Sequence, residues 1–259
     1  MDHGVQLHRS PGVEDGDGRQ VIPKNAFFFW DGPEMSWLRK ESVASFTRLN
    51  PSWDVSFVQS DVTVAHGGLL GSVLTSDWMR YRQLHRTGGF YFDTDIVFTR
   101  PIPDEWLEAD LVLPEMKNGR LVEIAALGSS KGQEFFRRAD LFCEEKILAG
   151  ANLGYWDLGS SLLSRCVHFA GNCSVLMLPI AMFYPVESWC VPVLWNKLGR
   201  QDYILDECVG VHWFAGDPTS RHYETLIDEQ WVSSDTFLSA AIRKSRSYAQ
   251  SLKMPMGGK

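Results

Sequence analysis

Residues 88–98 read Gly-Gly-Phe-Tyr-Phe-Asp-Thr-Asp-Ile-Val-Phe, an apolar run that two aspartates interrupt. The two glycines end a helix predicted over residues 76–87, because glycine adopts the left-handed conformation that closes a helix C-terminus. Ser76 is the expected N-cap of this helix. The apolar halves of the run, residues 90–92 and 96–98, predict one strand that the aspartates interrupt. The stretch therefore combines a helix, a tight turn and a strand that carries two carboxylates.

The sequence before this stretch predicts a strand, a helix and a second strand. Residues 26–30, Ala-Phe-Phe-Phe-Trp, form a short apolar run that the turn Asp31-Gly32-Pro33 ends. Apolar residues recur at helical spacing over residues 35–48, and residues 54–59 again predict a strand. This order is typical of a βαβ unit, so we expect an α/β fold with a parallel sheet.

The C-terminal part of the chain predicts further strands and helices. Strands are expected over residues 110–114, 121–127 and 175–178, and helices over residues 133–148 and 155–165. The stretch 166–186 lacks Asp, Glu, Lys and Arg and is long enough to span a bilayer. Pro179 and Pro185 would break such a helix, so we expect a buried strand between two loops and no membrane span.

The overall charge excludes one large class of partners. The chain has 259 residues with 25 basic and 32 acidic side chains, which gives a net charge of −7. Nucleic-acid-binding proteins need clustered Lys and Arg opposite the phosphates, so we expect no nucleic-acid partner. The five cysteines form no CxxC pair, which favours a reducing compartment over a zinc site or a disulfide framework.

The two ends of the chain differ from the rest in composition. Residues 1–20 are polar and lack an apolar run, which predicts a flexible leader and no secretion signal or anchor. Residues 251–259 predict a flexible tail. Because no interior linker is evident, residues 21–250 are expected to form one domain.

Asp93 and Asp95 form the most informative pair of side chains. Alternate residues of a strand share one face, so these two carboxylates are expected to point together. Oxygen ligands at a strand end favour Mn²⁺ or Mg²⁺, which also bind substrate phosphates; the alternative is a pair of surface acids in a turn. Asp77 and Arg80, three residues apart on the preceding helix, share a face. If they are exposed, their ion pair contributes only roughly 0.3–0.5 kcal/mol.

Three motifs together resemble a known enzyme family. Ser76-Asp77-x-x-Arg80 followed by Gly88-Gly89-Phe90-Tyr91-Phe92-Asp93-Thr94-Asp95 is similar to the donor-sugar motif of DxD glycosyltransferases. These are the family 32 enzymes of bacterial capsule and yeast mannan synthesis, with the related glucosylating domains of large clostridial toxins. Two further segments resemble motifs near the N-terminus and the C-terminus of members of the same family. They are Val21-Ile22-Pro23-Lys24, before an aromatic strand ending in Trp30, and Val211-His212-Trp213-Phe214-Ala215-Gly216.

The resemblance implies a fold and an activity. Family members have a GT-A-type single α/β domain with a central mixed, mostly parallel sheet flanked by helices. They are metal-dependent, retaining glycosyltransferases that move a hexose from a nucleotide-diphosphate sugar to a glycan or lipid-linked acceptor. For this chain the expected setting is the bacterial cytoplasm or the inner face of the membrane, in polysaccharide synthesis, with at most peripheral membrane contact.

The resemblance also assigns roles to individual residues. Asp95 would be the direct metal ligand, with Asp93 beside it and His212 completing the site, while Asp217 and Ser220 are alternatives to His212. The donor would be bound by Trp30 on the base, Asp77 and Arg80 on the sugar and phosphate, Asp93 on hydroxyl groups, and Tyr91 in the pocket wall. Asp93, Asp95 and Arg80 are thus the expected catalytic residues.

Two segments depart from the family pattern, and other functions stay open. Glu123 lies where relatives have an Asn-Ala pair, and residues 157–161 replace a Thr-Gly-Pro motif, so the donor and acceptor are not identified. Trp156, Trp189 and Trp195 are candidates for an acceptor groove, although most large aromatic residues belong to the core. The alternative functions are a degenerate relative that binds nucleotide sugars without transferase activity, and a Mg²⁺-dependent phosphohydrolase.

Overall fold

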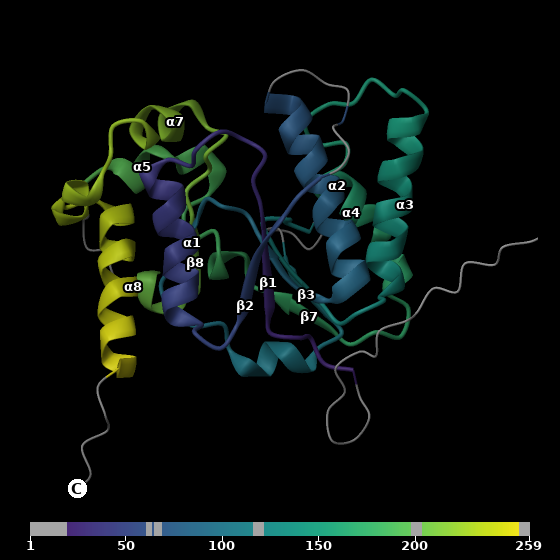
Figure 1. Ribbon diagram of the computed structural model, residues 1–259, viewed down its shortest axis with the longest axis horizontal. Coiled ribbons are helices and arrows are strands. Elements are labelled where there is room, and N and C mark those ends of the chain that lie inside the picture. The colour runs from purple at the N-terminus through teal and green to yellow at the C-terminus, as the bar shows by residue number, and fades with distance from the viewer. Residues whose placement is uncertain (1–19, 61–63, 65–68, 116–121, 198–203, 254–259) are drawn as a thin grey trace, which may run out of the picture.

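The computed structural model in Figure 1 describes residues 20–60, 64, 69–115, 122–197 and 204–253. The leader predicted over residues 1–20 therefore lies, except for Gln20, outside the described residues. Residues 251–253 of the predicted tail continue the last helix. The strands are β1 (Asn25–Phe29), β2 (Asp54–Val58), β3 (Gly89–Phe92), β4 (Ile96–Phe98), β5 (Leu111–Pro114), β6 (Ala126–Ser129), β7 (Val175–Leu178) and β8 (Gly210–His212).

The helices of the described residues vary widely in length. The α-helices are α1 (Trp37–Leu49), α2 (Leu69–Thr87), α3 (Glu134–Leu148), α4 (Ser160–Cys166), α5 (Pro192–Trp195), α6 (Ile204–Glu207), α7 (Pro218–Glu224) and α8 (Phe237–Lys253). Short 3₁₀ segments are η1 (Asp104–Glu108), η2 (Val167–Ala170), η3 (Ile180–Met182), η4 (Ser188–Cys190) and η5 (Glu229–Ser233). None of the described helices combines the length and apolar character needed to cross a bilayer.

A six-stranded mixed sheet forms the centre of the fold. Its strand order is β2-β1-β3-β6-β5-β7, with β1 parallel to both β2 and β3, and β5 parallel to β7. Strand β6 runs antiparallel to its neighbours β3 and β5. The predicted fold class, a mixed and mostly parallel sheet flanked by helices, is confirmed, and so is the predicted βαβ unit of β1, α1 and β2.

Strand β1 shows why its sequence is apolar throughout. Phe27 and Phe29 face a core that they share with α2, α3 and α4, whereas Ala26 and Phe28 face a second core that includes α1. Figure 1 shows these two groups of helices on opposite sides of the sheet. Because both faces of the strand are buried, the usual alternation of polar and apolar residues is absent.

Strand β4 does not continue β3 in the sheet, contrary to the single interrupted strand that we predicted. After β3 the chain turns at residues 93–95, and β4 pairs antiparallel with β8 in a separate two-stranded ribbon. A third core forms behind this ribbon, where Val97 and Val211 pack with residues of α8. The two aspartates therefore lie in a turn between two sheets and not on one strand, so the alternation argument was wrong.

Other boundaries also differ from the prediction. Helix α2 begins at Leu69, so Ser76 lies inside it and is not its N-cap. The strand predicted over residues 121–127 is β6, shifted to Ala126–Ser129, and residue 121 lies outside the described residues. Residues 155–159 form turns before α4, which shortens the helix predicted over 155–165. Strand β7 is present as predicted, but it is an edge strand with exposed side chains.

The glycines that close α2 are confirmed in that role. Gly88 has φ +68°, and its N–H donates to the carbonyl oxygen of Leu84 (3.0 Å). Gly89 has φ +111°, and a Cβ there would lie 2.6 Å from the carbonyl oxygen of Asn25 on β1. A side chain at either position would therefore strain the backbone, and at Gly89 it would also push β3 away from β1.

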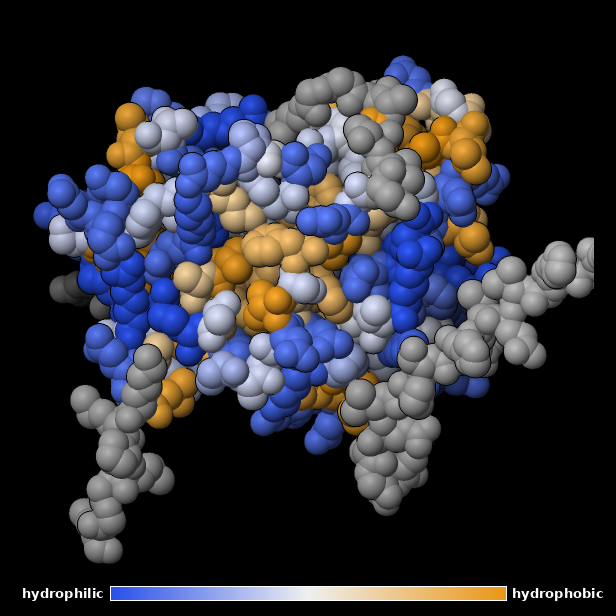
Figure 2. All heavy atoms as spheres, in the orientation of Figure 1, coloured by the Kyte–Doolittle hydropathy of each residue, from blue (hydrophilic) through white to orange (hydrophobic). Residues whose placement is uncertain are grey.

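One face of the molecule combines a hydrophilic area with an apolar one. Figure 2 shows hydrophilic side chains over α1 and α8, and apolar side chains in the middle of the face, where β2 runs. Phe57 on β2 is 44% exposed. The edge of the sheet at β2 is thus a place where the apolar interior reaches the surface.

Candidate functional site

Asp93 lies where β3 ends and the chain turns out of the sheet. Its backbone N–H donates to the carbonyl oxygen of Ala125 (2.8 Å), which fixes the turn beside β6. Its Oδ1 accepts a hydrogen bond from the Tyr91 hydroxyl (3.0 Å) and lies 3.3 Å from Nη2 of Arg80. The Asp93 side chain is 25% exposed, so the carboxylate is positioned from one side and reachable from the other.

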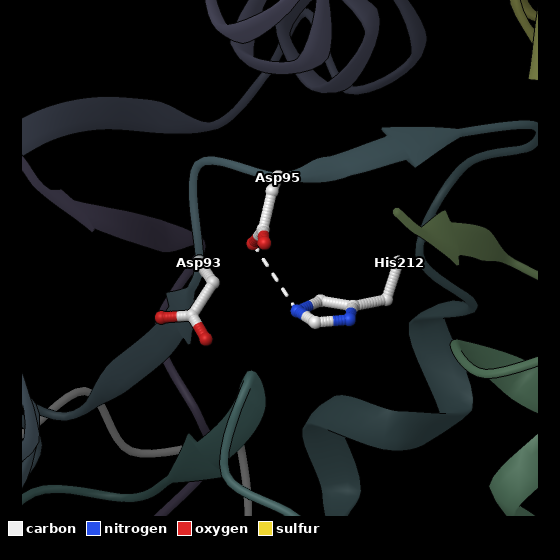
Figure 3. Close-up of side chains that lie close together, drawn as sticks. All are labelled: Asp93, Asp95 and His212. Atoms are coloured by element: carbon white, nitrogen blue, oxygen red, sulfur yellow. Dashed lines mark ion pairs between the residues drawn. The ribbon is translucent and has the colours of Figure 1, made fainter. Parts of the chain in front are cut away.

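Asp95 is more deeply buried, and the ribbon of β4 and β8 holds it. Ile96 pairs with His212 in the ribbon, which brings the imidazole beside Asp95. Nε2 of His212 lies 3.2 Å from Oδ1 of Asp95, and the backbone N–H of Ala215 donates to Oδ2 (2.7 Å). Figure 3 shows the side chains of Asp93, Asp95 and His212 arranged around a common space.

The turn after β8 brings the Ala215 N–H to Asp95. Phe214 has a φ of +53°, a left-handed conformation that is unfavourable for a bulky residue. The expected alternatives to His212 are used for other purposes: Asp217 caps α7 by accepting from the N–H of Thr219 (2.8 Å), and the Ser220 hydroxyl donates to the carbonyl oxygen of Trp213 (2.5 Å). Of the three candidates, His212 therefore faces the two aspartates.

Asp95 and His212 stabilise each other's charged forms. Burial alone would raise the pKa of Asp95, but His212, Arg39 and the Ala215 N–H hold it well below its usual value. Burial alone would lower the pKa of His212, but Asp95, with Asp93 and Glu123 farther away, raises it. Each of the two side chains therefore favours the charged form of the other.

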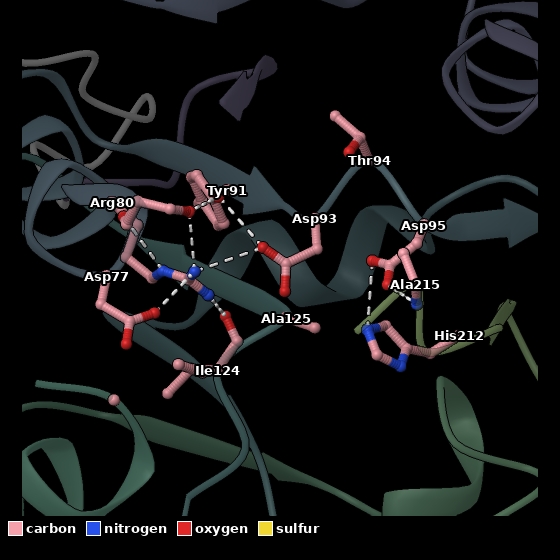
Figure 4. Close-up of polar contacts among 12 residues, drawn as sticks. Asp77, Arg80, Tyr91, Asp93, Thr94, Asp95, Ile124, Ala125, His212 and Ala215 are labelled. Atoms are coloured by element: carbon pink, nitrogen blue, oxygen red, sulfur yellow. Dashed lines mark hydrogen bonds and ion pairs between the residues drawn. The ribbon is translucent and has the colours of Figure 1, made fainter. Parts of the chain in front are cut away.

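Arg80 is buried and fully occupied by protein groups. Its guanidinium donates to the carbonyl oxygen of Ile124 (2.7 Å) and to the Ser76 hydroxyl (2.9 Å), and forms ion pairs with Asp77 (2.8 Å) and Asp93. It is 3% exposed and lies over the Tyr91 ring. The exposed helix-surface pair that sequence left open is thus wrong for these residues. Figure 4 shows Arg80 between Asp77 and Asp93, with Asp95 and His212 beyond.

Asp77 is an unusual carboxyl group because it is buried in a charged cluster. Burial raises its pKa to about 7, although Arg80 opposes this shift, and Asp93 adds to it. A Cβ on Gly159 would lie 3.0 Å from Oδ2 of Asp77, so the chain approaches the carboxyl closely at this glycine. A buried carboxyl with a raised pKa beside a specific charged partner is typical of a functional site.

Trp30 follows β1 and reaches the aspartate turn through Arg39. The Arg39 guanidinium lies 4.8 Å from the Trp30 ring centroid, and its Nη1 donates to the Thr94 hydroxyl (2.7 Å). The indole N–H of Trp30 donates to the carbonyl oxygen of Pro33 (2.7 Å), which fixes the ring. The ring is half-buried, so part of it stays open to a ligand.

Asp93, Asp95 and His212 form a possible divalent-metal site. One ligand atom from each of the three lies within 4.8 Å of the others. Ligands on opposite sides of an ion with bonds of about 2.1 Å are about 4.2 Å apart, so small side-chain rotations suffice. Two carboxylates and an imidazole suit Mn²⁺ better than Mg²⁺. Nδ1 of His212 is buried without a partner among the described residues, so the ring is not fixed through its other nitrogen.

Asp77, Asp93 and Asp95 form a row of carboxylates. Sequence reasoning missed three further residues around this row, which are Glu123, Tyr184 and Tyr155. Burial raises the pKa of Glu123, His212 opposes the shift and Asp93 adds to it. The Tyr184 ring lies 5.1 Å from the His212 ring, and its hydroxyl accepts from the N–H of Ala125 (3.2 Å). Tyr155 comes from the turn before α4. A charge in the apolar segment 122–127 was the available signal for Glu123, and the sequence offered none for the two tyrosines.

The other tryptophans named above differ in exposure. Trp195 is buried and stacked on Tyr223, with ring centroids 4.9 Å apart, so it belongs to the core. Trp189 and Trp156 are 74% and 60% exposed. Exposure alone leaves both available to a ligand.

Comparison with known proteins agrees with the DxD pattern. Residues 40–113 match the family model of the glycosyltransferase sugar-binding region containing a DXD motif. Among solved structures, PaToxG glycosyltransferase is similar with 12% identity over 90% of this chain and 87% of that chain (TM-score 0.46). A glycosyltransferase involved in the glycosylation of the major capsid of PBCV-1 is 7% identical over 78% and 100% (TM-score 0.49). GlyE of Streptococcus pneumoniae TIGR4 is 12% identical over 91% and 66% (TM-score 0.44). No curated protein sequence matches the chain.

Proposed function

We propose that the protein is a metal-dependent glycosyltransferase that moves a hexose, with retention of configuration, from a nucleotide-diphosphate sugar to a glycan or lipid-linked acceptor. The observation that carries the proposal is the convergence of Asp93, Asp95 and His212. Two of these residues belong to the DxD motif of the matched sugar-binding region. Retention of configuration is supported by the family resemblance.

The metal site would be built from side chains that the fold already orients. When bound, a divalent cation would neutralise the charge that develops on the departing diphosphate. Asp93, Asp95 and His212 would hold this cation. The Ala215 N–H fixes the rotation of the Asp95 carboxylate, and Arg80 does the same for Asp93. Because these supports are in place before a ligand arrives, the two carboxylates need little reorganisation on binding.

The donor would lie along the row of charged groups. Trp30 is proposed to stack on the nucleotide base, and Asp77 to bond to hydroxyl groups of the transferred sugar. Arg80 and Tyr91 are proposed to border the sugar, with Arg80 acting mainly by holding Asp93 in place. This placement agrees with the burial of Arg80 and with its saturation by protein oxygens.

The proposal is tested by measuring turnover of UDP- and GDP-sugars with Mn²⁺, Mg²⁺ or a chelator. We expect one nucleotide sugar to be hydrolysed slowly with Mn²⁺ and not with the chelator. Binding of a nucleotide sugar without any turnover would favour the degenerate relative. Release of phosphate from simple phosphate esters, with no effect of nucleotide sugars, would favour the phosphohydrolase and refute the transferase.

A further inference from the structure

The turn at residues 153–159, between α3 and α4, is firmly anchored. The Asp157 carboxylate accepts from the N–H of Gly154 (2.8 Å), which closes the turn. The Tyr81 hydroxyl on α2 donates to the carbonyl oxygens of Leu158 (2.9 Å) and Gly159 (3.3 Å), and the Leu158 side chain is fully buried. The turn is therefore held at a fixed position relative to α2.

The two ends of this turn reach both ends of the carboxylate row. Gly159 approaches Asp77, as described above. A Cβ on Gly216 would lie 3.4 Å from the Tyr155 hydroxyl oxygen, and Gly216 directly follows Ala215, whose N–H holds Asp95. The negative charges of Asp93, Asp77 and Asp95 add to burial in raising the pKa of Tyr155. Tyr155 thus stands beside the row with its hydroxyl protonated.

The turn presents two aromatic rings to solvent at this place. Tyr155 is 46% and Trp156 is 60% exposed, and their ring centroids are 5.0 Å apart in an edge-to-face arrangement. Large aromatic rings on an anchored turn, next to convergent polar groups, are typical of a ligand site. A tyrosine adds a polar hydroxyl to its apolar ring.

We propose that Tyr155 and Trp156 bind the sugar ring of the acceptor, so that the acceptor is a glycoside. Trp156 packs against the C–H face of the ring, and the Tyr155 hydroxyl bonds to one of its hydroxyl groups. This inference rests on the proposed function. The donor is assigned to Trp30, the metal residues and Asp77, and the aromatic turn borders both ends of this row, so a second sugar bound to the turn would lie beside the transferred one.

A hydroxyl oxygen of the acceptor forms a bond to the anomeric carbon of the hexose. The bond from that carbon to the diphosphate oxygen breaks, and the diphosphate leaves with the electron pair. The departing diphosphate takes up the hydroxyl proton. Tyr155 and Trp156 position the acceptor and are not catalytic residues.

The experiment compares Trp156→Ala and Tyr155→Phe with the wild type in two assays. The first measures hydrolysis of the nucleotide sugar by water, and the second measures transfer to a panel of p-nitrophenyl glycosides. For Trp156→Ala we expect the acceptor KM to rise about tenfold or more, from the loss of stacking, while hydrolysis stays within about twofold of wild type. Tyr155→Phe should raise the acceptor KM less. Tyr248→Ala and Tyr248→Phe, which alter a 39% exposed aromatic on α8, are the matched controls.

The outcomes separate this inference from the proposed function. An unchanged acceptor KM in Trp156→Ala would overturn the inference, as would failure of the wild type to bind or glycosylate any member of the panel while it hydrolyses the donor. Equal losses of hydrolysis and transfer would place the two rings at the donor and also overturn it. No hydrolysis of any nucleotide sugar by the wild type would refute the proposed function and the inference together.

Discussion

Replacing Arg80 by Met removes a buried positive charge from between two carboxylates and keeps most of the side-chain volume. Removing one partner of a buried ion pair costs about 3–5 kcal/mol, because the remaining charge stays buried without compensation. Here Asp77 and Asp93 both lose their ion-pair partner, and the Ile124 carbonyl and the Ser76 hydroxyl each lose a hydrogen-bond donor. We therefore expect Arg80→Met to lose about 3–5 kcal/mol of unfolding free energy at pH 8.5, which is a large part of the usual stability of a domain.

The loss should be smaller at low pH. The pKa of Asp77 is about 7 in the folded protein, against an ordinary value of about 3.9 in the unfolded chain. The folded state therefore binds a proton at Asp77 more tightly than the unfolded chain does. This difference adds to the unfolding free energy at low pH, and the contribution is lost as pH rises from about 4 to 7. Without Arg80 the pKa rises further, so the loss of stability continues above pH 7. At pH 5.5 Asp77 is protonated in the folded wild type and in folded Arg80→Met. The difference in unfolding free energy between the two proteins is therefore smaller at this pH.

Urea unfolding at pH 5.5 and 8.5 measures both effects. Adding Asp77→Asn to Arg80→Met removes the unpaired charge and keeps the shape of the side chain, so it should restore more than half of the loss at pH 8.5. A loss below about 1 kcal/mol in Arg80→Met would mean that the pair behaves as an exposed one. A further loss on adding Asp77→Asn would refute the charge argument itself.

Three further predictions concern the metal, the base and pH. Asp95→Asn keeps an acceptor for the Ala215 N–H but loses the charged partner of His212 and a metal ligand. We therefore expect a folded protein with neither Mn²⁺-dependent turnover nor calorimetrically detected Mn²⁺ binding. Near-normal turnover would disprove the metal assignment, and a chelator should abolish wild-type turnover. Trp30→Ala should weaken nucleotide binding about tenfold or more, because stacking contributes roughly 1–3 kcal/mol, whereas Trp30→Phe should retain most of it; equal calorimetric affinities for Trp30→Ala and the wild type would contradict the stacking. In the chelator-treated protein, His212→Gln should lower the melting temperature most near pH 5 and least near pH 9. The raised pKa of His212 contributes stability that is present below about pH 6.5 and lost as pH rises through that pKa, and the lowered pKa of Asp95 contributes stability that is lost as the protein becomes strongly acidic. A difference in melting temperature that does not vary with pH would exclude this linkage.

Local patterns predicted the strands that are buried on both faces. The aromatic runs of β1 and β3 are apolar at every position, and both faces of these strands are buried in the cores on the two sides of the sheet. The glycines after α2 determine where that helix ends. The same patterns located Asp93 and Asp95, but the reason given was wrong. The two carboxylates come together because the chain turns between two sheets, and a turn of this kind has no two-residue period from which it can be predicted.

Long-range contacts were beyond local patterns. His212 was identified by resemblance, and its pairing with Asp95 depends on the register of β4 and β8. The burial of Arg80 depends on the position of Ile124 and the residues around it. The sequence does not show this burial, because an Asp and an Arg three residues apart occur on exposed helices as well. Tyr155 reaches the site because Tyr81 anchors its turn, a contact between residues far apart in sequence.

The hydrogen bond between Ala215 and Asp95 joins residues 120 positions apart, and this separation affects how the protein folds. Closing a flexible loop of that length costs about 4 kcal/mol in chain entropy, beyond a constant term. The βαβ unit of β1, α1 and β2 closes a much shorter loop, so we expect it to form early, with the β4–β8 ribbon among the last elements to assemble. A chain still in synthesis would hold both aspartates but neither His212 nor the Ala215 N–H. Tight metal binding would then mark the completion of folding.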